Sequence, residues 1–90
     1  METKKTLYII SIDAYGTRKS KNFNKCITAS SINDANEKGE KWMDRLIHES
    51  DGEFPEWELV DVSVCYDKDK KEGDVWAYVI DEETYSFSEE

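Results

Sequence analysis

Residues 6–13 read TLYIISID, a β-branched and aromatic run that is too short for a helix and is therefore predicted to be a strand. Apolar side chains occupy both alternating sets of positions in this run. A strand that is apolar on both faces is typical of the covered middle of a sheet, whereas an edge strand usually has a wetter side. We therefore expect residues 6–13 to form a central strand.

A polar turn containing Gly16 follows, and residues 22–28 are predicted to form a second strand. Both faces of this strand carry polar side chains. The mixture predicts an edge position, at which Lys25 would discourage pairing with another chain.

A helix is predicted next, beginning at Ser30 or Ser31 and ending near His48. Either serine can cap the first turn, and Asp34 is well placed at the positive end of the helix dipole. Spacings of three and four residues define one apolar stripe, which consists of Ile32, Ala35, Gly39, Trp42, Met43, Leu46 and Ile47. Because a glycine costs up to about 1 kcal/mol in a helix interior, its place in this stripe predicts a close approach of the helix to a sheet.

An acidic loop at residues 49–56 leads into a third predicted strand at residues 57–66. A fourth strand is predicted at residues 75–80, joined to the third by a charged hairpin turn at residues 67–74. Residues 82–90 form an acidic C-terminal tail, whose pattern fits either a short edge strand or a disordered segment. Strict alternation in the third strand places on one face Val60, Val62, Val64 and Tyr66.

This order of elements predicts one α+β domain over residues 1–81, a two-layer ββαββ fold with one helix on a four-stranded, mainly antiparallel sheet. The preferred strand order is 2-1-3-4, and the alternative is 2-1-4-3. One helix covers only one face of the sheet, so the other face is left to solvent, a tail or a partner. The sequence determines the pairing register of the strands only to within one residue, and a shift of one residue exchanges the two faces. The aromatic candidates for the open face are Tyr8, Tyr66, Trp76 and Tyr78.

The chain of 90 residues has a formal net charge of −9, and its charge is unevenly distributed. Residues 1–30 carry six bases and two acids, whereas residues 31–90 carry six bases and nineteen acids. A negative surface repels nucleic acids and anionic membranes, because contacts to phosphate dominate the affinity for both. We therefore expect no direct nucleic-acid binding and no membrane association.

No basic residue lies between Arg45 and Lys68. The seven acids of that interval are Glu49, Asp51, Glu53, Glu56, Glu58, Asp61 and Asp67. Such a stretch costs stability through self-repulsion, so it serves either solubility or a positively charged partner.

Residues suited to catalysis or metal binding are scarce. His48 is the only histidine, and its place at the helix C-terminus is explained by the helix dipole. Cys26 and Cys65 lie in predicted strands and are expected to be reduced, half-buried thiols. The segment 67–74 begins like a calcium loop, but Lys71 replaces the fifth-position ligand. We expect no catalytic residue, no bound metal and no cofactor.

A family resemblance rests on YIISI at residues 8–12, KCITASS at residues 25–31, a following helix that contains Ala35, and a Val-rich hairpin. These features resemble the small ββαββ proteins of phages and mobile elements, a layout shared by some type I anti-CRISPR inhibitors. The first half is also similar to HicB-type antitoxins, although residues 16–19 (GTRK) stand where their glycine and aspartate signature is expected. No functional residue is carried over from either group.

The leading hypothesis is a non-enzymatic, acidic binding protein that engages a basic, nucleic-acid-handling protein, as a phage-type inhibitor or DNA mimic would. No signal-peptide core is present, so we expect a cytoplasmic protein, in the host cell if the chain is phage-encoded. The alternative is a self-associating regulatory module, a homodimer formed through the open sheet face or an edge strand. A small enzyme is the third reading. The predicted partner-binding residues are Glu40, Asp44, Glu49, Asp51, Glu53, Glu56, Glu58, Trp57 and Trp76.

Overall fold

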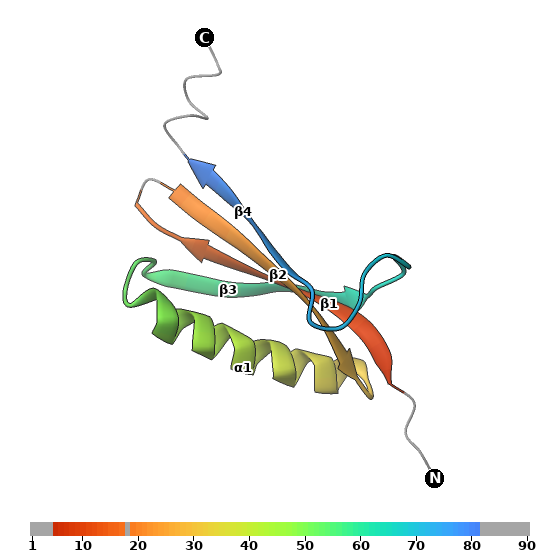
Figure 1. Cartoon of the computed structure of the whole chain (residues 1–90). Coiled ribbons are helices and arrows are strands. Elements are labelled where there is room, and N and C mark those ends of the chain that lie inside the picture. Colours follow the sequence, from red (N-terminus) through yellow and green to blue (C-terminus); the bar gives the residue numbers. More distant parts are fainter. Residues whose placement is uncertain (1–4, 18, 82–90) are drawn as a thin grey trace.

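The computed structural model describes residues 5–17 and 19–81, which form two layers (Figure 1). One layer is a four-stranded antiparallel sheet and the other is a single helix. The predicted small α+β fold is confirmed, and the predicted tail at residues 82–90 lies outside the described residues. The elements are β1 (Thr6–Tyr15), β2 (Lys19–Ala29), α1 (Ile32–Ser50), β3 (Glu56–Val64) and β4 (Val75–Asp81).

The strand order is β3-β1-β2-β4, and every neighbouring pair is antiparallel. The central position predicted for β1 is confirmed, as is its pairing with β2. Both predicted strand orders are wrong, because β4 pairs with β2 from Lys25↔Val75 to Lys19↔Asp81 instead of forming a hairpin with β3. For the same reason β2 is an interior strand and not an edge strand.

The polar side chains of β2 have a different explanation from the predicted edge position. Its two asparagines, Asn22 and Asn24, belong to a hydrogen-bonded ladder on the sheet face opposite the helix. Ser11 Oγ donates to Asn24 Oδ1, and Asn24 Nδ2 donates to Asn22 Oδ1 at 2.7 Å. Asn22 Nδ2 donates in turn to Asp13 Oδ1 at 2.7 Å. Because these groups satisfy one another, a central pair of strands tolerates them on a partly solvated face.

The segment between β3 and β4 crosses the sheet instead of turning tightly, so the predicted hairpin turn is wrong. At its start, Cys65 N–H donates to Leu7 O at 2.8 Å, beside β1. At its end, Gly73 N–H donates to Cys26 O, and Cys26 N–H donates to Asp74 O, both at 2.9 Å. The segment therefore runs from the end of β3, at one edge of the sheet, to the far side of β2, where β4 begins. Cys26 is fully buried.

The helix begins as its sequence predicts, and most of its predicted apolar stripe packs against the sheet, but Ile32 and Ile47 are 50% and 39% exposed and do not belong to the packed face. Ser31 is the N-cap, and its Oγ accepts a hydrogen bond from Asp34 N at 3.1 Å. Figure 1 shows α1 lying along the sheet with β4 on the far side, and α1 packs against β3, β1 and β2. The close approach predicted at Gly39 is confirmed, because a Cβ atom there would lie 3.0 Å from Ile10 Cγ2. The buried core consists of Tyr8, Ile10, Ile12, Ala29 and Ala35.

The predicted alternation of the third strand is interrupted by a β-bulge. The register with β1 shifts between Ser11↔Asp61 and Ile12↔Leu59, which leaves Val60 as the extra residue. Leu59 therefore packs against the core, whereas Val60 is 41% exposed. The predicted pattern is wrong here because a single inserted residue exchanges the two faces of a strand.

The aromatic set predicted for the open face is divided. Tyr8 is buried in the core beneath the helix, at 7% exposure. Trp76 and Tyr78 do lie opposite the helix, because they pair with Asn24 and Asn22 of the polar ladder. Tyr66 lies beyond the end of β3 and is 87% exposed.

Candidate functional site

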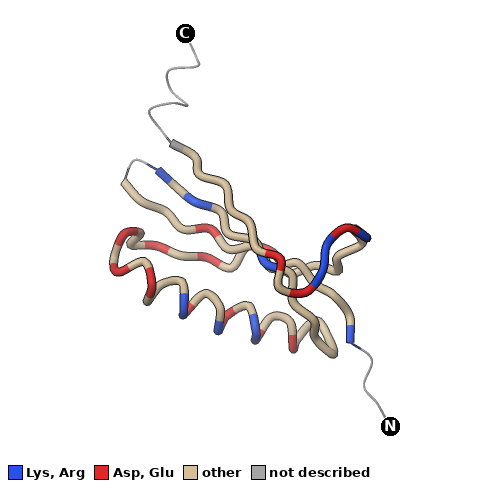
Figure 2. Tube along the Cα trace, viewed as in Figure 1, with Lys and Arg blue, Asp and Glu red and all other residues tan. Residues whose placement is uncertain are grey.

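Acidic side chains gather at the end of the molecule where α1 turns into β3 (Figure 2). The helix ends at Ser50 and is capped by Asp51, whose left-handed φ of 56° is followed by Gly52 with a φ of 83°. These two residues reverse the chain tightly, so acids before and after the turn come together. We call this surface the acidic end, and its exposed residues are Glu49, Asp51, Glu53, Glu56 and Glu58.

A cluster of three aromatic rings supports the acidic end. We call it the aromatic cluster, and it consists of Phe23, Phe54 and Trp57. Phe54 is 4% exposed and meets Trp57 edge to face, with ring centroids 5.9 Å apart. Trp57 Nε1–H donates to Phe54 O at 3.0 Å, and its ring stacks on Phe23 at 5.6 Å. The structure thus places the predicted contact residue Trp57 within the packing that supports the loop.

Two residues of β1 extend the acidic end beyond the predicted set. Asp13 pairs with Glu58 across the strands, and Tyr15 lies next to both. The Tyr15 hydroxyl is 3.2 Å from Asp13 Oδ2 and 3.3 Å from Glu58 Oε1, and its single hydrogen is shared between these carboxylates. Partial burial, followed by the charges of Asp13 and Glu58, raises the pKa of Tyr15 above its usual value.

Among the described residues, Lys19 is the base that enters this surface. Lys19 Nζ lies 3.4 Å from Glu53 Oε2, and both side chains are about half exposed. An ion pair with this exposure contributes little stability, but it offsets one negative charge. Lys21 does not reach a carboxylate of the acidic end and lies instead 4.9 Å above the Phe23 ring. Counted over the described residues, the surface keeps an excess of negative charge.

The remaining predicted contact residues lie elsewhere. Glu40 and Asp44 are exposed on α1, and the nine residues from Glu40 to Glu49 correspond to about 13 Å of helix rise. Trp76 belongs to β4 at the opposite edge of the sheet, where Lys70 Nζ lies 4.1 Å above its ring. The structure therefore brings together the five acids near the turn and separates them from Glu40 and Trp76, whereas Asp44 lies five residues before Glu49, about 7 Å of helix rise.

Among residues 5–17 and 19–81, no group of three or more His, Cys, Asp or Glu side chains is arranged to hold a metal ion. The acids of the acidic end form an exposed surface and not an enclosed pocket. Chemically, such a surface offers several full negative charges to a cationic partner.

Sequence reasoning missed a second charged feature, a groove between α1 and β2 that gathers basic side chains. The available signal was the spacing of Lys38, Lys41 and Arg45 by three and four residues, which places them along one side of a helix. Their meeting with Lys25 of β2 follows only from the packing of the helix on the sheet. We call this feature the basic groove.

The described part of the chain contains no helix that is long and apolar enough to cross a membrane. Comparison with known proteins gave no match to a family model, to a curated protein or to a solved structure.

Proposed function

We propose that the chain is a non-enzymatic binding protein whose acidic end engages a basic, nucleic-acid-handling protein, as a phage-type inhibitor or DNA mimic would. The observation that carries this proposal is the gathering of acids from three elements at one end of the molecule. Asp13 comes from β1, Glu49 from α1 and Glu58 from β3. Acids gathered from several elements repel one another more than scattered acids would, and a cationic partner would relieve this repulsion.

In this proposal the acidic end works by steering and orientation. Long-range attraction would raise the association rate with a basic surface, and complementary charges would fix the docking geometry. Short-range energy would come from Tyr15, which is 37% exposed beside Asp13 and Glu58 and offers an aromatic face with a polar tip. The interaction should therefore weaken as salt screens the charges.

The test compares two triple variants that carry the same change of charge. Glu49→Lys, Glu53→Lys and Glu56→Lys reverse the acidic end, whereas Glu37→Lys, Glu40→Lys and Asp44→Lys reverse exposed acids of α1. Affinity capture from the native host identifies a basic partner, and titration of the purified partner at low and moderate salt gives the affinities. The first variant should lose binding and its salt dependence, and the second should keep both. Equal losses in the two variants would refute the assignment of the surface.

A second candidate function, self-association, is favoured by the exposed edge strand β4. Its residues 75–80 read VWAYVI and include no charge, and Val75, Tyr78, Val79 and Ile80 are 54–60% exposed. The other edge, β3, carries acids and the bulge at Val60, two devices that discourage edge pairing. Two copies could join their β4 strands into one continuous sheet.

Sedimentation separates this candidate from the first. A dimer that persists in high salt and is abolished by Val79→Lys would support pairing through β4. The matched control is Val60→Lys, which adds the same charge at the other edge and should leave the dimer intact. A monomer at every concentration and salt would eliminate self-association.

A further inference from the structure

The basic groove is an open depression between α1 and the second half of β2, with a volume of roughly 400 Å³. The segment that crosses from β3 to β4 closes one end of it, through the hydrogen bonds that join Gly73 and Asp74 to Cys26. Volumes of about 300–1,000 Å³ are typical of small-molecule sites. The groove is thus of a size suited to a small ligand.

Four cationic side chains line this depression together with a single acid, Glu72. Lys38, Lys41 and Arg45 come from α1, and Lys25 comes from β2. Four of the ten Lys and Arg residues in the described part of the chain therefore meet in one place, in a protein with a net charge of −9. Lys38, Lys41 and Arg45 repel one another by a few tenths of a kcal/mol per pair at these spacings, and within α1 the ion pair of Lys38 with Asp34 offsets part of this cost.

The four cations are not equally engaged within the protein. Lys38 Nζ donates to Thr28 O at 2.9 Å and lies 3.7 Å from Asp34 Oδ2. For Lys25, Lys41 and Arg45, no carboxylate of the described residues lies within 4 Å. These three charges remain available to an anion that enters the groove.

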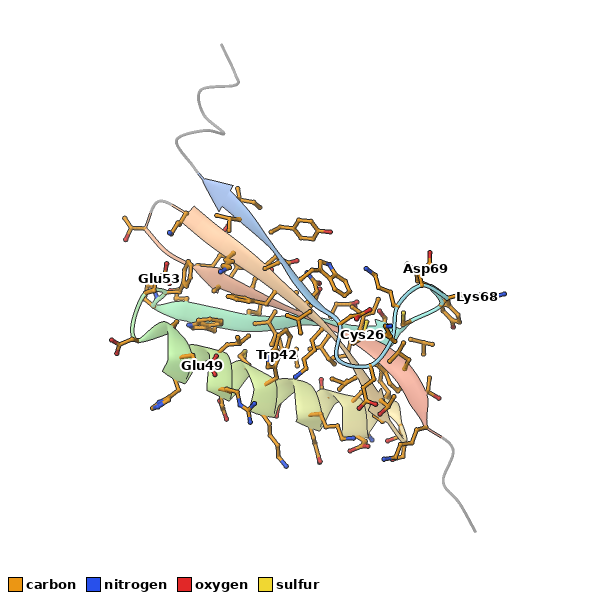
Figure 3. The ribbon with its side chains drawn as sticks, in the orientation of Figure 1. Cys26, Trp42, Glu49, Glu53, Lys68 and Asp69 are labelled. Atoms are coloured by element: carbon orange, nitrogen blue, oxygen red, sulfur yellow. The ribbon has the colours of Figure 1, made fainter. Side chains whose placement is uncertain are left out.

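Trp42 provides an apolar wall beside these charges. Its side chain is half-buried between the helix and the sheet (Figure 3), and Lys25 Nζ lies 5.5 Å from its ring centroid. An indole next to convergent cations matches a ligand that has a flat or apolar part and a charged part. A guanidinium presents paired N–H donors that fit a phosphate, and ammonium groups add point charges.

We propose that the basic groove binds a small organic phosphate of the nucleotide type. The phosphates contact Lys25, Lys41 and Arg45, the ring system packs against Trp42, and Lys38 serves as a positioning residue that is tied to Thr28. This site lies apart from the acidic end and does not depend on the function proposed for it. Three unpaired cations from two elements favour a multiply charged phosphate over a single carboxylate.

Isothermal titration calorimetry with ATP on the full chain tests the proposal, with tripolyphosphate and adenosine as the probes for the two halves of the ligand. ATP should bind more tightly than tripolyphosphate, and adenosine should bind far more weakly than either. The proposal is overturned if adenosine binds as well as ATP, if tripolyphosphate equals ATP, or if none of the three binds at millimolar concentration.

Two double variants with the same change of charge locate the site. Lys41→Gln with Arg45→Gln removes two groove cations at exposed helix positions and should weaken ATP binding at least tenfold. Lys5→Gln with Lys68→Gln removes two exposed cations that do not line the groove, and should leave the affinity within twofold. Equal weakening in both would show non-specific attraction and overturn the site. Circular dichroism of each variant confirms that the fold is retained.

Discussion

Gly39 of α1 lies directly against Ile10 of β1, so that a Cβ atom on Gly39 would come within 3.0 Å of Ile10 Cγ2 and 3.3 Å of Ile10 Cδ1. Ile10 is fully buried in the core, where close packing resists the displacement of a side chain. The glycine therefore sets the distance between the two layers of the fold.

Substitution Gly39→Ala should lower the free energy of unfolding. Overpacking of a core costs about 1–3 kcal/mol, whereas the gain in helix propensity from Gly to Ala is about 1 kcal/mol. We expect a net loss of about 1 kcal/mol, measured by urea denaturation. In an Ile10→Val background, which removes the Cδ1 contact, the same substitution should cost less. A Gly39→Ala protein that is more stable than wild type would contradict the close packing.

The helix could be predicted from sequence because its signals are local. The cap at Ser31 and the apolar stripe, with Gly39 inside it, depend on residues a few positions apart. The four strands were found for the same reason, since β-branched alternation is a property of each segment alone.

The order of the strands could not be predicted, because it depends on contacts distant in sequence. A short charged segment between two strands favours a hairpin, yet β3 and β4 lie at opposite edges of the sheet. β4 pairs with the first half of β2, from Lys19 to Lys25, and no local sequence pattern reveals this pairing. The bulge at Val60 was hidden as well, since an inserted residue leaves no mark in an alternating sequence.

The acidic end was predictable only in part. Its five acids between Glu49 and Glu58 follow one another along the chain, so their concentration was visible as composition. Asp13 and Tyr15 join them through the pairing of β1 with β3. The basic groove also needed tertiary packing, because Lys25 and Arg45 come from different elements.

The aromatic contact between Phe54 and Trp57 should control the order of the acidic loop. Phe54→Ala removes a buried ring and should cost about 3–5 kcal/mol of unfolding free energy. Trp57→Phe keeps a ring but loses the donor to Phe54 O, and should cost about 1 kcal/mol. Urea denaturation gives both values.

Digestion with a protease specific for glutamate provides a local measurement of the same aromatic contact in a milder variant, Phe54→Leu. Cleavage after Glu49, Glu53 or Glu56 should accelerate more in Phe54→Leu than in the control Val60→Leu, which changes an exposed residue on the same sheet edge. Equal cleavage rates in Phe54→Leu and Val60→Leu would show that the aromatic cluster does not restrain the loop.

The two thiols should differ sharply in reactivity. Burial, followed by the neighbouring Cys65, raises the pKa of the Cys26 thiol, which lowers its thiolate fraction. Cys65 is only partly buried. In native protein at about pH 8, Ellman's reagent should label one thiol quickly and the second only on unfolding. Cys65→Ser should abolish the fast phase and Cys26→Ser should retain it, whereas fast labelling of both thiols would contradict the burial of Cys26.

Asp34 should make a pH-dependent contribution to stability at the start of α1. The Ser30 backbone N–H, 3.0 Å from Asp34 Oδ2, lowers the pKa of this carboxyl below 3.8, and the charge of Lys38 acts in the same direction. Because the pKa of Asp34 is lower in the folded chain than in the unfolded chain, its carboxylate stabilises the fold at pH values above the unfolded pKa. This contribution is lost as the pH falls through the folded pKa.

The difference in unfolding free energy between wild type and Asp34→Asn should therefore be constant near neutral pH and shrink below 3.8. Urea denaturation over a series of pH values measures it. The matched control is Ser31→Ala, which removes the N-cap acceptor of Asp34 N and should cost about 1 kcal/mol. Because Ser31 does not titrate, its cost should persist where that of Asp34→Asn disappears. A difference for Asp34→Asn that stays unchanged from neutral to acidic pH would show that the carboxylate charge does not hold the first turn of the helix.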